Sequence, residues 1–358
     1  MYHRIVVKVG TKVLSGDDGL ILDEFVEHIV RQVSAFNKKG IEIILVTSGA
    51  VGSGRGIIGK KDSEETVEDK QVFAAVGQVR LMETYARLFR RFGLSCAQIL
   101  VTKEDFRDRN HYHNMRQCFQ NLLRDGIIPV VNENDAIAIK ELLFTDNDEL
   151  AGLIAAQLQA DVLVILTSVD GILDGSPSAP GSKTIVRIEA GKLSEIRKHI
   201  TADKTSAGRG GMLSKFAVAK RLSDSGIAVH IADGRSGTVL RDILEGKPVG
   251  TTIVPSKKTS GIKRRLAHSD GLSIGAITVN DCVKKIFLSD DSAISLLPIG
   301  IVAVNGDFHT GDVVEIRSST GNRIGFGIAK CDADQVKKIA GMKGGRAVIH
   351  RDYMFIER

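Results

Sequence analysis

Short apolar runs alternate with amphipathic helical segments along the first 255 residues, and this alternation restricts the possible fold more than any other feature. The expected strands are mostly apolar along their length: Ile5–Val9, Glu42–Val46, Ala97–Val101, Ile127–Val131, Val162–Leu166 and Ala228–Ile231. Between them, apolar residues recur at helical spacing in Asp23–Asn37, Gln71–Arg91, His113–Arg124, Asn147–Gln159 and Gly211–Ser225. Apolar strands joined by helices are typical of a mostly parallel sheet that is covered on both faces. The sequence therefore predicts an α/β fold, a three-layer αβα sandwich.

The alternation stops around Pro255–Arg265, where the composition becomes polar and basic, as it does in linkers. Beyond this point, short apolar runs separated by turn residues follow one another closely: Ala276–Val279, Lys285–Leu288, Gly300–Val304, Val313–Ile316, Arg323–Ala329 and Ala347–His350. This spacing predicts a small antiparallel β-barrel. We expect domains at residues 1–256 and 271–355, joined by a linker at residues 257–270.

Charge, apolar run length and cysteine usage argue against several classes of protein. Lys and Arg number 49 against 43 Asp and Glu, a net charge of +6 that is too low to predict nucleic-acid binding by itself. The longest apolar runs are strand-length, whereas a membrane-spanning helix needs about 20 residues. The four cysteines form no CxxC pair, which favours free thiols in a reducing compartment. Because the opening MYHRIVVKVG lacks the features of a signal peptide, we expect a cytoplasmic protein.

Three polar segments each follow a predicted strand at its carboxyl end, where open α/β sheets bind ligands. The segment Lys8–Thr11 offers an ammonium group and backbone N–H groups to a phosphate, although an ordinary strand-end lysine is the alternative. Thr47–Arg55 is predicted to be a glycine-rich loop, and its glycines match neither the dinucleotide nor the Walker pattern. Asn132–Asp135 suits a polar, charged small molecule, with Asp135 accepting from an ammonium group; a loop with Asx turns is the alternative.

Two further segments precede predicted helices. Thr145–Glu149 contains three acids, of which one would suffice to cap the helix, so their crowding predicts that cations or a ligand compensate the others. Gly208–Lys215 can place N–H donors, a hydroxyl and an ammonium group around a phosphate chain, or it is a flexible linker. His111 and His113 have a poor spacing for metal ligands and no third ligand nearby, so we predict no metal site there.

Taken in order, VVKVGT, VTSGA, VNENDA, TDNDEL and GRGGMLSK resemble the amino acid kinase superfamily and, within it, the glutamate 5-kinases. The connecting segments KQVFAAVGQVRLM and AKRLSDSGIAVHIADG match as well, and LLPIGIVAVNGDFHTGDVVEI resembles a PUA domain. The resemblance covers nearly the whole chain. It implies ATP-dependent phosphorylation of the side-chain carboxylate of L-glutamate to L-glutamate 5-phosphate, the first step of proline biosynthesis.

The resemblance also implies roles for individual residues. Asp148 would orient two catalytic lysines, Lys8 and Lys215, and glutamate would be held by Ser48, Asp135 and Asn147. ATP would be bound by Lys8, Thr167, Ser168, Arg209, Gly210, Gly211, Met212, Leu213, Ser214 and Lys215. Its Mg²⁺ would be held largely by phosphates and waters, and we name no protein ligand for it. The chain departs from the family pattern at Ser168, Arg209 and the segment 171–181, and these departures concern nucleotide binding.

The implied partners are glutamate, ATP, proline as a feedback inhibitor, a glutamate-5-phosphate reductase and further copies of the chain in a dimer or tetramer. Related kinases that phosphorylate acetylglutamate, aspartate, carbamate or a nucleotide are one alternative, and a catalytically inactive regulator is another. A third is an RNA-binding protein, because PUA domains commonly bind structured RNA. Against that alternative, residues 259–358 carry 14 basic and 11 acidic side chains, a net charge of only +3.

Overall fold

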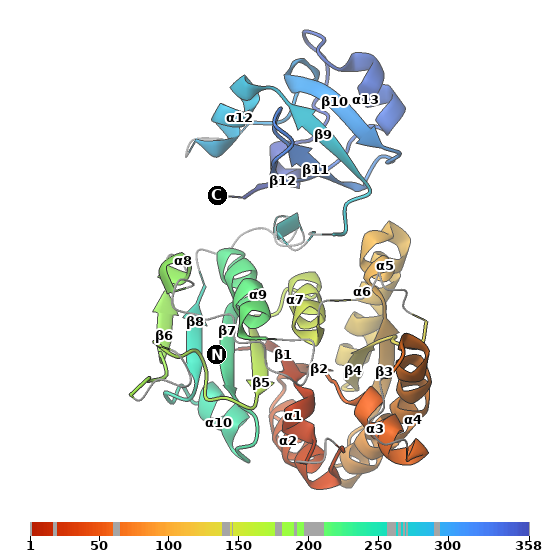
Figure 1. Ribbon diagram of the computed structural model, residues 1–358, viewed down its shortest axis with the longest axis vertical. Helices are drawn as coiled ribbons and strands as arrows, with labels where there is room; N and C mark the ends of the chain where they lie inside the picture. The colour runs from red at the N-terminus through yellow and green to blue at the C-terminus, as the bar shows by residue number, and fades with distance from the viewer. Residues whose placement is uncertain are drawn as a thin grey trace. The chain divides into compact units, whose positions relative to one another are not determined.

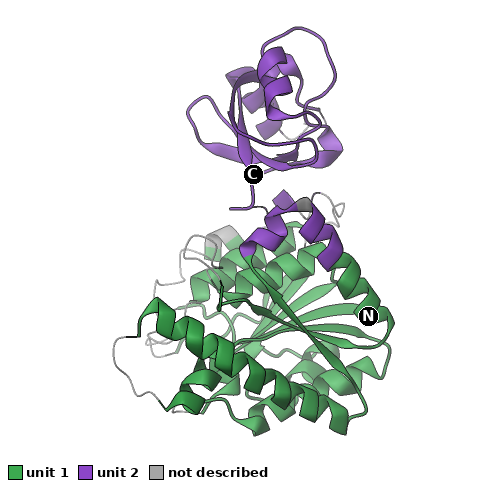
Figure 2. Ribbon diagram, turned by 90° about the vertical axis from the view of Figure 1, so that its right-hand side faces the viewer, with its two compact units in different colours: residues 1–102, 116–258 green, residues 103–115, 259–358 purple. Residues whose placement is uncertain are grey.

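The computed structural model describes residues 2–16, 20–59, 65–137, 144, 146–175, 181–189, 192–196, 211–255, 263, 266–267, 269, 271–289 and 294–357. The chain divides into two compact units, one of residues 1–102 with 116–258 and one of residues 103–115 with 259–358 (Figure 2). Among the described residues, every helix is too short or too polar to cross a membrane.

The first unit is built on an eight-stranded sheet with the order β3-β4-β2-β1-β5-β7-β8-β6. Its strands are β1 (Arg4–Val9), β2 (Glu42–Val46), β3 (Cys96–Val101), β4 (Ile128–Glu133), β5 (Val162–Thr167), β6 (Arg187–Glu189), β7 (Ala228–Asp233) and β8 (Thr251–Val254). All neighbours from β3 to β7 run parallel, whereas β8 is antiparallel to β7. The mostly parallel α/β sheet is therefore confirmed. The short strands β6 and β8 were not predicted.

Helices lie on both faces of this sheet, which confirms the three layers (Figure 1). They are α1 (Thr11–Leu14), α2 (Asp23–Asn37), α3 (Ala50–Ile58), α4 (Val67–Arg91), the part of α6 (Arg109–Arg124) from residue 116 on, α7 (Asn147–Gln157), α8 (Leu193–Ile196), α9 (Met212–Asp224) and α10 (Val239–Leu244). Helix α5 (Lys103–Arg107) and the start of α6 group with the second unit. Helices α7 and α9 pack together on one face. Helices α2 and α10 contact each other on the opposite face.

Strand β1 shows how the sheet positions a polar side chain. Successive side chains of a strand point to opposite faces, and Ile5, Val7 and Val9 join the apolar core shared with α2 and α4. Val6 and Lys8 therefore point to the other face, which α7 covers. The alternation thus directs the one lysine of β1 toward the first turn of α7.

The glycine-rich segment after β2 is mostly helix α3, so the prediction of a loop over Thr47–Arg55 was wrong. Its glycines allow α3 and α4 to pack closely. A Cβ atom at Gly54 would lie 1.9 Å from the carbonyl oxygen of Phe73, and one at Gly77 would lie 1.8 Å from the carbonyl oxygen of Ala50. Glycine is a poor helix former, but here the close backbone contact of two helices requires it.

The second unit contains a five-stranded sheet with the order β10-β9-β11-β12-β13. Its elements are β9 (Gly275–Val279), α12 (Asp281–Leu288), β10 (Ile301–Gly306), β11 (Val313–Arg317), β12 (Arg323–Ile328), α13 (Ala333–Ile339) and β13 (Met354–Ile356), with short 3₁₀ turns at Pro298–Gly300 and Arg351–Tyr353. A core of mostly aliphatic side chains lies against this sheet, including Ile277, Phe287, Val314 and Ile316.

Three expectations for this unit need correction. The pairing of β9 with β11 is parallel, so the sheet is not wholly antiparallel. The run Lys285–Leu288 belongs to α12, because Asn280 caps this helix by accepting a hydrogen bond from the Val283 N–H, at 2.9 Å. The run Ala347–His350 contributes only a single bridge between Leu296 and Ile349. The linker predicted at residues 257–270 lies mostly outside the described residues.

Candidate active site

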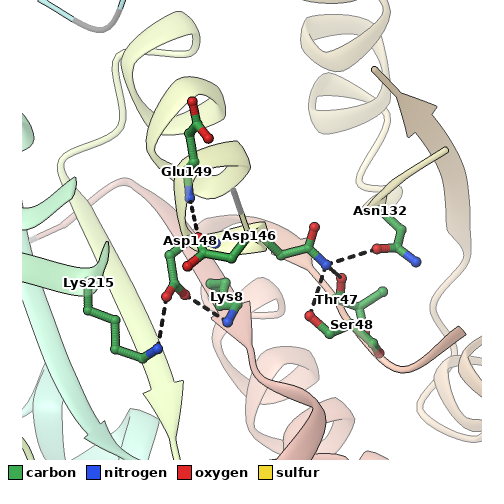
Figure 3. Close-up of polar contacts among 9 residues, drawn as sticks. Lys8, Thr47, Ser48, Asn132, Asp146, Asp148, Glu149 and Lys215 are labelled. Carbon is green, nitrogen blue, oxygen red and sulfur yellow. Dashed lines mark hydrogen bonds and ion pairs between the residues drawn. The ribbon is translucent and has the colours of Figure 1, made fainter. Parts of the chain in front are cut away.

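Two lysines from distant parts of the chain share one buried carboxylate at the carboxyl edge of the sheet (Figure 3). Lys8 Nζ, from the end of β1, lies 2.7 Å from Asp148 Oδ1. Lys215 Nζ, from the first turn of α9, lies 2.9 Å from Asp148 Oδ2. Asp148 is fully buried, and each lysine residue is only 6% exposed. The structure thus brings together the three residues that the resemblance assigns to catalysis.

The electrostatics of this cluster favour an anionic ligand. Burial by itself would raise the pKa of Asp148, but the ammonium groups of Lys8 and Lys215 outweigh burial and hold that pKa below its ordinary value. Asp148 is therefore ionised at neutral pH. Two ammonium groups on one carboxylate leave a net charge of +1 in a site sheltered from water, where charge acts strongly. Such a site can hold phosphate oxygens.

Two of the acids at the start of α7, Asp146 and Asp148, make different contacts. Asp146 is the N-cap, and its Oδ1 accepts from the backbone N–H groups of Asp148 at 2.9 Å and Glu149 at 3.1 Å. Burial and the neighbouring Asp148 raise the pKa of Asp146. Both interpretations of this segment were therefore right, since one acid caps the helix and two cations compensate another. Thr145 lies outside the described residues.

Asn147, one of the three residues expected to bind glutamate, contacts a second one, Ser48. Its side-chain nitrogen Nδ2 donates to the backbone carbonyl of Thr47 at 2.8 Å and lies 2.9 Å from Ser48 Oγ. The same nitrogen lies 3.0 Å from Oδ1 of Asn132, which is at the end of β4. These contacts fix the polypeptide after β2 against the start of α7 and β4.

Asp135, the third expected glutamate ligand, lies in the turn after β4 and lines a pocket of about 170 Å³. The pocket is formed by α3, α4, β3 and the segment after β4; its lining residues are Ala50, Ala74, Ala75, Gln78, Val79, Gln98, Leu100, Glu133, Asn134, Asp135 and Ala136. The structure thus puts Asp135 in a pocket that is lined by neither Ser48 nor Asn147.

The residues expected to bind ATP come from two elements of the sheet's carboxyl edge. Thr167 ends β5, the strand between β1 and β7, and Ser168 follows it. Gly211 is the N-cap of α9, so Met212, Leu213, Ser214 and Lys215 form the first turn of that helix. Backbone N–H groups at a helix start suit phosphate binding. Arg209 and Gly210 lie outside the described residues.

Sequence reasoning missed several polar residues that support this site. Tyr85 is buried on α4, and its hydroxyl lies 2.9 Å from Thr47 Oγ1. Burial raises the pKa of Tyr85 to about 12, so it remains a neutral hydrogen-bonding group. Gln78, also on α4, lies 3.0 Å from Asn132. Gln78 lies within the segment KQVFAAVGQVRLM, for which only the family resemblance gave a signal, and no motif marks Tyr85.

Known proteins resemble this chain along its whole length. Residues 3–233 match the amino acid kinase family and residues 275–351 match the PUA domain. The glutamate 5-kinase of Bacteroides thetaiotaomicron is 44% identical, with 99% of each chain covered. The glutamate 5-kinase of Chlorobaculum tepidum is 45% identical, with 99% of this chain and 98% of the relative covered.

Solved structures with low sequence identity share the fold of the first unit. Carbamate kinase from Giardia lamblia bound to AMP-PNP aligns with a TM-score of 0.52 at 17% identity, over 71% of this chain and 98% of that one. UMP kinase from Bacillus anthracis aligns with a TM-score of 0.50 at 15% identity, over 71% of this chain and 96% of that one. With full-length relatives this similar, the chain belongs to the glutamate 5-kinases of the amino acid kinase family and carries a PUA domain.

Proposed function

We infer that this protein acts as a glutamate 5-kinase, transferring a phosphoryl group from ATP to the side-chain carboxylate of L-glutamate in the first step of proline biosynthesis. One observation carries this conclusion: a chain 44% identical to a glutamate 5-kinase holds a buried cluster of two lysines on one aspartate. A carboxylate is already a nucleophile at pH 7, so the reaction needs no general base. It needs positioning and cationic compensation, which such a cluster provides.

We propose that Lys8 bridges the substrate carboxylate and the transferred phosphoryl group, and that Lys215 stabilises charge on the phosphoryl and leaving groups. Asp148 orients both ammonium groups through the contacts at 2.7 and 2.9 Å. Thr167, Ser168 and the first turn of α9 form part of the ATP site in this proposal. Their place at the ends of a strand and a helix supports it.

We propose Mg²⁺ as the ion that accompanies ATP. Mg²⁺ prefers oxygen ligands and is usually bound by one or two carboxylates together with phosphates and waters. In this proposal the ion is held largely by the ATP phosphates and waters. The ion would neutralise phosphate charge during the transfer.

The reaction is tested by supplying ATP with glutamate, acetylglutamate, aspartate or UMP and measuring ADP release. Hydroxylamine traps acyl phosphates as hydroxamates, so it identifies a carboxylate as the acceptor. We expect rapid ADP release and hydroxamate formation with glutamate. Faster turnover of another acceptor would assign the chain to a different substrate.

Asp135→Ala is expected to raise the KM for glutamate while changing the KM for ATP less than about twofold. The proposed partner of Asp135 is the α-ammonium group of glutamate, which ATP lacks. A lost hydrogen bond to a charged group costs about 1.5–3 kcal/mol, which predicts an increase in KM of about 10- to 150-fold. Steady-state kinetics with each substrate varied in turn measure both constants. Equal increases for the two substrates would indicate a structural role for Asp135.

We propose that the protein is a homo-oligomer, a dimer or tetramer, as the family resemblance implies. Exposed valines on one face of α4 support this proposal: Val72, Val76 and Val79 recur at helical spacing, and Val79 is 72% exposed. Ile57 on α3 is 55% exposed and borders the same groove as Val76 and Val79. Proline inhibition, a reductase partner and a cytoplasmic location remain predictions.

A chain truncated at Ser256 is expected to fold and to keep kcat for glutamate within about threefold of the full chain. The proposed catalytic residues lie at or before Lys215, and β8 ends at Val254. Residues 103–115 group with residues 259–358 in the second unit. The truncated chain keeps the first of these segments but lacks the second, against which it packs. Turnover, proline sensitivity and mass in solution are measured for both chains. A folded truncated chain without kinase activity would show that the proposed domains are not functionally separable.

A further inference from the structure

Three side-chain amides form a chain of hydrogen bonds beside the active site, and backbone groups fix the direction of the first two. The Thr47 carbonyl can only accept, so the atom of Asn147 that faces it, at 2.8 Å, is the nitrogen. The atom of Asn132 that faces this nitrogen, at 3.0 Å, is an oxygen, and it also accepts from the backbone N–H of Glu133, at 3.0 Å. Asn132 must therefore present its own nitrogen to the next residue.

That next residue is Gln78, whose Oε1 accepts from Asn132 Nδ2 at 3.0 Å. The amide nitrogen of Gln78 is then the end of the chain. This nitrogen is fully buried and has no hydrogen-bond partner among the described residues. The residue as a whole is 8% exposed. Leaving a buried donor unpaired costs about 1–3 kcal/mol, so folding alone gives no reason for this arrangement.

Gln78 lines the same pocket of about 170 Å³ as Asp135. A comparable cavity volume, about 150 Å³, can hold a benzene molecule, so the pocket can take the α-carbon end of an amino acid. Among the described residues, the pocket is lined by the carboxyl-bearing Glu133 and Asp135 but by no Lys or Arg. A ligand carboxylate bound there therefore needs a neutral hydrogen-bond donor from the protein. It also needs a positive charge within the ligand itself, and a zwitterionic amino acid carries one in its α-ammonium group.

We propose that Gln78 is a specificity-determining residue whose Nε2 donates a hydrogen bond to the α-carboxylate of the amino-acid substrate. Asp135 takes the α-ammonium group of the same substrate. The reacting side-chain carboxylate lies instead at Lys8 and Lys215, neither of which lines this pocket. This inference rests on the proposed glutamate kinase function and adds the group by which the enzyme selects an α-amino acid.

The experiment compares glutamate with 4-aminobutyrate, which has the same amine and reacting carboxylate but lacks the α-carboxylate. Gln78→Glu keeps an oxygen that can accept from Asn132, and it replaces the donor with a negative charge. Gln78→Met removes the donor without adding charge. For glutamate, each variant is expected to raise KM by at least about 10-fold, with the KM for ATP unchanged within about twofold. For 4-aminobutyrate, we expect Gln78→Met to change KM by less than about threefold.

Where 4-aminobutyrate is turned over too slowly, its inhibition constant against glutamate replaces KM. Gln71→Glu is the matched control, because Gln71 lies on the same helix, α4, but does not line the pocket. We expect Gln71→Glu to change KM for glutamate by less than about threefold. Equal losses for glutamate and 4-aminobutyrate in Gln78→Met, or no loss for glutamate, would overturn the assignment of Gln78. A wild-type enzyme that forms no hydroxamate from glutamate would instead contradict the proposed function.

Discussion

Lys8→Ala and Lys215→Ala are each expected to lower kcat by about 10²- to 10³-fold, the loss typical of one preorganised group that stabilises transition-state charge. Each lysine donates from a rigid element, β1 or α9, to the same buried carboxylate. Because all three side chains are buried, a charge placed there is worth more than one at the surface. Steady-state turnover with saturating glutamate and ATP measures the effect.

Folding should suffer much less than catalysis in these two variants. Breaking a buried ion pair is costly when it leaves an uncompensated charge. Here, removing one lysine leaves Asp148 paired with the other, and the net charge of the cluster falls from +1 to zero. Thermal unfolding monitored by circular dichroism should therefore change little in either variant.

Lys220→Ala is the matched control for Lys215→Ala. Lys220 lies on the same helix, and its side chain is 37% exposed and pairs with Asp224 at 2.8 Å. An exposed pair of this kind contributes at most about 1 kcal/mol to stability, so we expect normal turnover from this variant. Near-normal turnover in Lys8→Ala or Lys215→Ala as well would contradict the catalytic assignment of the cluster.

The parts of the site that the sequence could predict are those with a positional rule behind them. Lys8 follows from the rule that ligands bind at the carboxyl ends of parallel strands, and Lys215 from the polar first turn of a helix. The three acids before α7 were informative because helix capping needs only one of them. The contact between the two lysines and Asp148, across 140 and 67 residues of sequence, was implied only by family resemblance.

Other features depend on tertiary contacts that no local pattern contains. Gln78 and Tyr85 are single polar residues on the buried face of α4, and their partners lie on other elements. Helix α3 contains three glycines, which by intrinsic propensity disfavour a helix. Close packing against α4 overrides that propensity, and this is why the prediction of a loop over Thr47–Arg55 was wrong.

The packing of α3 on α4 leads to the second large effect, a loss of stability in Gly54→Ala. The new Cβ would lie 1.9 Å from the carbonyl oxygen of Phe73, a backbone atom of α4 that can move only if the helix moves. Overpacking a core costs about 1–3 kcal/mol, and a backbone obstacle places this substitution at the upper end. At about 2–4 °C per kcal/mol, we expect Tm to fall by roughly 10 °C.

Gly56→Ala separates this packing effect from helix propensity, because it adds the same methyl group two residues further along α3. Its Cβ would meet only the end of the Leu20 side chain, at 2.8 Å, which can rotate away. Alanine favours a helix over glycine by about 1 kcal/mol, so this variant should be at least as stable as wild type. Helix α3 begins at Ala50, two residues after Ser48, so displacing it in Gly54→Ala should also raise KM for glutamate. Equal Tm values for the two variants would mean that α3 and α4 do not pack as closely as the structure describes.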